Sequence, residues 1–222
     1  MKKILVSAVL TAIGCISVAA QGNIFNNPAN KPYFGVRIGG DITCPGDFKA
    51  DKVGVSVYKN GGGFEFGGIY NLPIIANFYI EPGLKLYYDT YSMTDDWLEI
   101  MSNFDIDSAS IRKFGMRIPV MAGYHFDFGS NVKVSVFTGP ELEIGFVAKE
   151  HIKASVVSSS ESVYGEDGGM NRIDLLWGIG AGVSYQHFYF GINGGIGMLN
   201  MLSDSDAKFH ENRVTIGVGY NF

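Results

Sequence analysis

Residues 111–126 read IRKFGMRIPVMAGYHF, and two kinds of side chain alternate along them. From Phe114 to Phe126 every even position is apolar or aromatic, whereas the odd positions include Lys113, Arg117 and His125. Successive side chains of a β-strand point to opposite faces of the sheet. The stretch therefore predicts a long strand with one continuously apolar face.

The same period of two returns in seven further segments, so the chain has eight candidate strands. The seven segments are residues 34–41, 64–71, 78–89, 132–146, 172–184, 188–198 and 213–222. Several have the ~10 residues that a tilted strand needs to cross a bilayer. Phe137 is an exception to the alternation within its segment.

The spacing of the connections separates a membrane barrel from a soluble sandwich, because both have one apolar face. Long gaps at residues 43–62, 92–108, 150–171 and 199–212 alternate with short gaps at 73–76, 127–131 and 186–187. Long loops at one end and tight turns at the other are typical of outer-membrane barrels. We therefore expect an all-β fold, an eight-stranded antiparallel up-and-down transmembrane β-barrel over residues 33–222, with four mobile loops.

Aromatic side chains gather near the ends of the expected strands. Near the short turns lie Tyr33, Phe34, Tyr70, Phe78, Tyr124, Phe126, Tyr185, Phe188, Tyr220 and Phe222. Tyr88, Tyr91 and Trp97 lie near the long loops. Aromatic girdles at both interfaces are expected of membrane barrels.

The face opposite the apolar one carries glycines and charges of both signs. A barrel of eight strands has an interior only just wide enough for side chains. We expect a salt-bridged plug in this lumen, made of Arg37, Glu65, Glu81, Lys85, Lys113, Arg117, Glu141, Glu143, Arg172, Asp174 and Arg213, with Asp41, Asp89, Lys133 and Lys149 on the same face. Such a plug would prevent free diffusion of solutes.

The composition fits this class and disfavours others. The 222 residues include 30 glycines, and 14% are aromatic, which favours short strands and turns over helices. No apolar run approaches the ~20 residues of a membrane-spanning helix. The formal net charge is −5 and basic residues form no cluster in the sequence, so we expect no nucleic-acid partner.

The N-terminus has the three parts of a secretory signal peptide. Lys2 and Lys3 precede an apolar run at Ile4–Val18, and a small-residue cleavage site ends at Ala20. We expect residues 1–20 to be removed on export through the Sec pathway, and residues 21–32 to form a short periplasmic segment. Cleavage before Cys15, as in a lipoprotein, is the alternative.

Loss of the leader would leave Cys44 as the single cysteine. An internal disulfide is then ruled out, and stability must come from a core or from a membrane.

Six segments together resemble a known family. They are residues 34–41 (FGVRIGGD), 80–84 (IEPGL), 117–120 (RIPV), 137–141 (FTGPE), 178–182 (GIGAG) and 212–222 (NRVTIGVGYNF). The chain is similar to the PorT-like outer-membrane β-barrel family of Bacteroidota, and more distantly to the small barrels OmpX and OmpA. The resemblance implies an outer-membrane location. A few family members are associated with type IX secretion, and nothing in the sequence selects that role.

The last of these segments resembles the C-terminal signal of barrel proteins, with Val218, Tyr220 and Phe222 at alternate positions. The resemblance implies that the barrel-assembly machinery is a partner during biogenesis.

No pattern predicts catalysis, a metal site or a cofactor. We expect His125 to lie in the lumen, in a salt bridge. Glu150-His151 and His210-Glu211 near the long loops would suit an acid–base pair, and this is the enzyme hypothesis. Residues 95–107 lack the spacing of a calcium loop, and the glycines of 165–169 lack the lysine of a phosphate loop.

The expected function follows from the fold and these negative findings. We expect a non-enzymatic surface or envelope protein that contacts outer-membrane lipid and lipopolysaccharide, and whose loops meet an unidentified surface or envelope partner. A narrow channel or a secretion-associated component is the alternative, followed by a barrel enzyme acting on lipid or peptide.

Overall fold

The computed structural model describes residues 31–50, 53–102, 106–128, 131–154, 158–164, 169–203 and 207–222. The expected signal peptide and most of the segment 21–32 lie outside these residues. Eight strands make up the body of the molecule: β1 (Tyr33–Pro45), β4 (Gly61–Ile75), β5 (Phe78–Ser92), β6 (Ile106–Asp127), β7 (Val132–Ala154), β9 (Ile173–Tyr185), β10 (Phe188–Gly197) and β11 (Glu211–Asn221).

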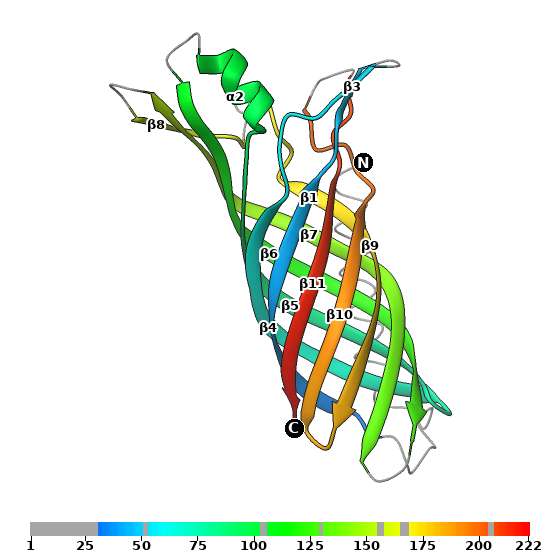
Figure 1. Ribbon diagram of the computed structural model, residues 1–222. Coiled ribbons are helices and arrows are strands. Elements are labelled where there is room, and N and C mark those ends of the chain that lie inside the picture. Colours follow the sequence, from blue (N-terminus) through cyan, green and yellow to red (C-terminus); the bar gives the residue numbers. More distant parts are fainter. Residues whose placement is uncertain are drawn as a thin grey trace.

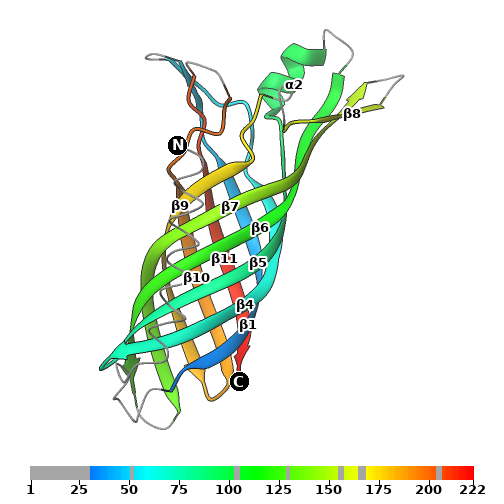
Figure 2. The same ribbon diagram turned by 180° about the vertical axis from the view of Figure 1, so that it is seen from behind.

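These strands close into an antiparallel barrel (Figure 1, Figure 2). The order is β6-β5-β4-β1-β11-β10-β9-β7, and β7 pairs again with β6. The first and last strands meet at the seam, from Gly35 opposite Asn221 to Pro45 opposite Glu211. Closure removes the unpaired edges of the sheet. The prediction of an eight-stranded up-and-down barrel is confirmed.

Alternation along the strands sorts side chains to two faces, as β1 illustrates. Phe34, Ile38 and Ile42 are exposed on the outside, whereas Arg37 and Asp41 are buried inside. The other barrel strands continue the outer band of exposed aliphatic and aromatic side chains. A contiguous exposed apolar surface of this kind marks contact with a membrane.

Three tight connections define the short-turn end: β4 to β5, β6 to β7, and β9 to β10. The C-terminus lies at this end too (Figure 1). Ala76, Asn131 and Gln186 have positive φ angles of 50°, 74° and 54°. Residues other than glycine adopt that conformation at a cost, and tight hairpins require it.

The opposite, long-loop end is more structured than the sequence predicts. It carries the helix α2 (Asp95–Ser102), the strand pair β2 (Phe48–Ala50) and β3 (Val53–Val55), and the short strand β8 (Ser158–Ser162). Strands β6 and β7 rise beyond the barrel rim toward α2 and β8 (Figure 1, Figure 2). Among the described residues, no helix is long and apolar enough to cross a membrane.

Apolar side chains from these loops and from the long-loop ends of β5, β6 and β7 form a core over the barrel mouth, which we call the cap. Its buried members are Tyr91, Ile111, Ala148, Val163, Tyr164, Met170, Met201 and Phe209, with Phe48, Tyr58 and Leu202 packed against them. Phe209 is fully buried and its ring centroid lies 4.6 Å from that of Phe48. The cap lies at the long-loop end of the lumen, where its Tyr91 hydroxyl donates to Glu211 of β11.

Candidate functional site

Arg117 on β6 is the centre of the lumen and is almost completely buried. Its guanidinium donates to Asp41 on β1 at 2.7 Å, Glu65 on β4 at 3.0 Å and Glu143 on β7 at 2.9 Å. It also donates to Asp89 on β5. Side chains from five strands therefore meet at one cation, which we call the Arg117 hub.

Two further cations extend the hub toward the cap. The Lys113 ammonium donates to Glu211 and lies 3.6 Å from Glu143. Arg213 on β11 donates to Glu141 and, at 3.5 Å, to Glu143. A buried charge has a large desolvation cost unless it is paired and hydrogen-bonded. The pairing of both signs is what makes this polar interior tolerable.

Other predicted lumen residues lie inside the barrel around the hub. Lys85 donates to Glu65 at 2.6 Å, and Glu81 accepts a bond from Asn71 at 3.0 Å. The Arg37 guanidinium lies 4.0 Å from the Tyr189 ring centroid.

Asp174 on β9 is also buried. Its carboxylate accepts from the backbone N–H of Leu175 at 2.7 Å. Arg37, Glu81 and Asp174 are thus inward but make no direct described bond to Arg117.

Arg172 requires a correction. Its side chain is exposed, donates to the Phe146 carbonyl at 3.3 Å and lies over the Tyr164 ring. Strand β9 begins only at Ile173, so the alternation that would turn residue 172 inward does not yet operate there.

Sequence reasoning missed Glu211 as a member of the lumen network. The neighbouring His210 suggests a pair on a loop, but β11 begins at Glu211 and turns this side chain inward. There it accepts bonds from Lys113 and from the Tyr91 hydroxyl, the latter at 2.5 Å. The sequence contained a signal for this position, because Glu211 is two residues from Arg213 and residues two apart on a strand share a face.

The inward tyrosines were also missed. Tyr79, Tyr87 and Tyr189 point into the lumen, and each ring lies over glycines of neighbouring strands. A Cβ atom added at Gly123 would overlap the Tyr79 ring, and one at Gly182 would overlap Tyr189. The glycines of the inner face therefore make room for aromatic rings as well as for charges.

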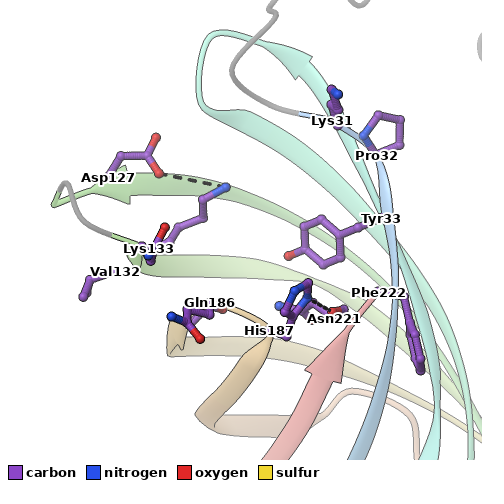
Figure 3. A pocket seen from close by; sticks show the side chains of 12 residues that line it. Lys31, Pro32, Tyr33, Asp127, Val132, Lys133, Gln186, His187, Asn221 and Phe222 are labelled. Atoms are coloured by element: carbon purple, nitrogen blue, oxygen red, sulfur yellow. Dashed lines mark hydrogen bonds and ion pairs between the residues drawn. The ribbon is translucent and has the colours of Figure 1, made fainter.

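The short-turn end opens into a polar pocket of about 620 Å³ (Figure 3). Tyr33 projects into it from β1, so this aromatic does not join the outer girdle as we expected. Lys133 lies 3.9 Å from Asp127 across the hairpin, and His187 Nδ1 lies 2.7 Å from the Asn221 carbonyl oxygen. This mouth is open and polar, in contrast to the capped end.

Outside this mouth, aromatic side chains are exposed on the barrel surface as expected. They are Phe34, Tyr70, Phe78, Phe126, Tyr185, Phe188, Tyr220 and Phe222. Val218, Tyr220 and Phe222, the residues of the predicted assembly signal, lie on the outer face at the end of the chain and are all exposed.

The histidines do not form a catalytic arrangement in the described residues. His125 lies in the lumen, 3.0 Å from the Ser135 hydroxyl and stacked on Tyr79, rather than in the expected salt bridge. Glu150 and His151 are neighbours on one strand and point to opposite faces. No group of three or more His, Cys, Asp and Glu side chains in the described ranges could hold a metal ion.

Residues 20–203 match the family described as "Outer membrane protein beta-barrel domain". No curated protein matches the sequence significantly. Among solved structures, the chain is similar to the Neisserial surface protein A (14% identity, TM-score 0.45, 87% of this chain and 100% of that one). It is also similar to OprG of Pseudomonas aeruginosa (11%, 0.45, 86% and 95%) and to Ail, the attachment invasion locus protein of Yersinia pestis (17%, 0.42, 87% and 100%).

Proposed function

The chain belongs to the outer membrane protein beta-barrel domain family, and on that basis we propose that it is a non-enzymatic surface protein that displays its capped end to the exterior. The protein resides in the outer membrane. The short-turn end then faces the periplasm, as in other barrels with this loop asymmetry. The structured cap and the raised strands β6, β7 and β8 form the displayed part, which would contact an envelope or surface partner.

The filled lumen is the observation that carries this proposal. The Arg117 hub joins five strands across the barrel interior, and the cap covers the mouth above it. A channel needs a continuous aqueous path, and a barrel of this strand number leaves no room beside such side chains. A rigid, closed scaffold is suited to presenting loops rather than to passing solutes.

Two measurements test the proposal. Impermeant maleimide should label Lys208→Cys in a Cys44→Ser background on intact cells, whereas Gln186→Cys at the opposite end should react only after permeabilisation. Both positions are exposed. In planar bilayers the purified protein should give no discrete conductance steps. Reproducible steps would favour the narrow-channel alternative, and reversed labelling would overturn the orientation.

The C-terminal residues support a second part of the proposal, recognition by the barrel-assembly machinery. Phe222→Ala should lower the amount of folded barrel in cells and leave refolding into detergent unchanged. Phe188→Ala is the matched control, because Phe188 (65% exposed) and Phe222 (68%) are equally accessible at the same end. Equal losses for both variants would contradict a specific signal.

The six sequence segments support a finer placement among PorT-like barrels of Bacteroidota. A secretion role within that group predicts that a deletion strain accumulates type IX cargo in the periplasm, and normal secretion would rule that role out.

A further inference from the structure

The part of the sheet that rises above the barrel has two chemically different faces. Beyond the rim, β6 continues to pair with β7, and β8 adds a third strand to β7. We call this three-stranded part, with the end of β5, the extension. Because directly opposite residues in paired strands share a face, the register decides which side chains lie together.

The outer face of the extension carries only hydroxyl and basic side chains in two successive rows. The first row is Thr90, Arg112, Lys149 and Ser162, and the second is Ser92, Ser110, His151 and Ser160. Lys149 was expected on the lumen face, but the register shift between Val147 and Gly145 adds one residue to β7 and turns Lys149 outward. Lys153 follows one row higher, opposite Ser108. We call this set the basic face. This face carries positive charge, whereas the chain as a whole has a net charge of −5.

The carboxylates of the same strands lie on the other face. Glu150 is opposite Ile111 of the cap on one side and Glu161 on the other. Burial, and then the neighbouring Glu161, raise the pKa of Glu150. The strands of the extension therefore send their anions toward the cap and their cations outward, so the two are not available to neutralise each other.

The cations of the basic face have no ion pair among the described residues. Arg112, Lys149 and Lys153 are exposed, and no salt bridge involves them in the described ranges. Lys59, at the edge of the face, pairs with Asp95 of α2 at 3.0 Å. A groove of about 490 Å³ runs along the face, and its lining includes Ser110, Arg112, His151, Lys153 and Ser160.

The basic face continues the lipid-contacting surface of the barrel. Phe114 lies opposite Val147, on the same face as Arg112 and two residues nearer the barrel along β6. Phe114, Val147 and the adjacent Phe146 are all exposed. At ~3.3 Å per residue, Arg112 and Lys149 lie about 7 Å beyond that apolar row along the strand, or about 5 Å along the membrane normal for a strand tilt of about 40°. The headgroup layer of a bilayer leaflet is about 5–8 Å thick. The first cationic row is therefore at headgroup depth.

We propose that the basic face binds phosphate groups of anionic outer-leaflet lipids. Arginine matches phosphate oxygens with two parallel N–H donors, lysine adds a point charge, and the serine hydroxyls add neutral donors. Charge complementarity and continuity with the lipid face select a membrane lipid as the occupant. This proposal depends on the orientation given under Proposed function for its assignment to the outer leaflet.

The test is the affinity of the full-length barrel for phosphatidic acid, a lipid phosphate monoester, in neutral detergent micelles by native mass spectrometry. Arg112→Gln/Lys149→Gln removes two cations from the basic face. Lys49→Gln/Lys208→Gln removes two exposed cations at the same end but outside it. Each cation near an anionic headgroup contributes about fivefold in affinity. We expect the Kd of the first bound lipid to rise at least about fivefold in the first variant and to stay unchanged in the second.

Equal affinities in the two variants, or equal losses, would overturn the proposal. Displacement of the lipid by 10 mM inorganic phosphate would also overturn it, because the site would then be one for soluble anions. Heat-modifiable migration checks that each variant is folded, and Lys149→Gln alone serves if the double variant is not. Micelles have no sidedness, so a reversed maleimide result would overturn the orientation and the outer-leaflet assignment without altering the measured Kd.

Discussion

Replacing Arg117 by methionine should destabilise the barrel, because it leaves a buried carboxylate without its cation. Methionine keeps much of the length of the side chain and removes its charge. Breaking a buried ion pair by removal of one partner costs about 3–5 kcal/mol, because the remaining charge stays buried. Arg117 has four carboxylate partners, so the question is how many would be left alone.

The contacts around the hub answer that question. Glu143 keeps Lys113 and Arg213, and Glu65 keeps Lys85. Asp41 keeps the Thr215 hydroxyl at 2.6 Å and Arg213 at 4.0 Å. Among the described contacts, Asp89 alone loses its only ion pair.

The expected loss is therefore that of one uncompensated carboxylate, about 3–5 kcal/mol in the free energy of unfolding. Asp89→Asn added to Arg117→Met should recover most of it. Lys85→Met is the matched control: its partner Glu65 keeps Arg117, so the loss should be about 1 kcal/mol.

The assay is urea unfolding in lipid vesicles, followed by heat-modifiable migration and by the fluorescence of Trp97 and Trp177. A loss for Arg117→Met no larger than that for Lys85→Met would refute the hub as the centre of the network. A further loss on adding Asp89→Asn would show that the stranded carboxylate is not the cause.

Three other substitutions test the lipid face, the inner face and the turns. Val120 lies midway between Phe114 and Phe126 on the outer face of β6. Val120→Arg should lower the free energy of unfolding in vesicles by ~2–4 kcal/mol, and an unchanged free energy would show that the assigned register of β6 is wrong. Gly123→Leu should cost about 1–3 kcal/mol by overlap with Tyr79, and the same change in a Tyr79→Ala background should cost clearly less; equal costs would exclude the overlap. Ala76→Gly should raise stability by about 1 kcal/mol in urea titrations, since glycine adopts the positive φ of 50° without a Cβ clash, and a destabilised variant would mean that the turn is not strained.

The barrel could be predicted from the sequence because the two faces of each membrane strand differ strongly. Along β1, apolar Ile38 and charged Arg37 alternate, and a one-residue error would exchange them. The extension was not predicted, because above the membrane this contrast fades. Ser108 and Ser110 on one face alternate with Ala109 on the other, which has no strong apolar period.

The remaining misses have specific physical causes. Tyr79 and Tyr87 are aromatic but inward, because glycines on adjacent strands leave space that only the cross-strand register reveals. The cap joins Phe48 to Met201 and Phe209, which lie more than 150 residues further along the chain, and no local period marks such contacts. The prediction that Arg172 points inward depended on where β9 begins, and alternation alone locates strand ends poorly.

The hub also has a consequence for how the barrel reaches its final form. Its ligands come from β1, β4, β5 and β7, and Arg213 of the last strand reaches across the seam to Asp41 of the first. A strand paired one residue out of step would send its carboxylate to the lipid side and leave Arg117 with a partner missing. Incorrectly aligned or unclosed intermediates therefore retain uncompensated charge in the interior, and this charge is neutralised once the strands that carry the hub are paired in register. Charges without partners in the interior therefore raise the free energy of misaligned barrels, and this favours the correctly paired barrel during assembly.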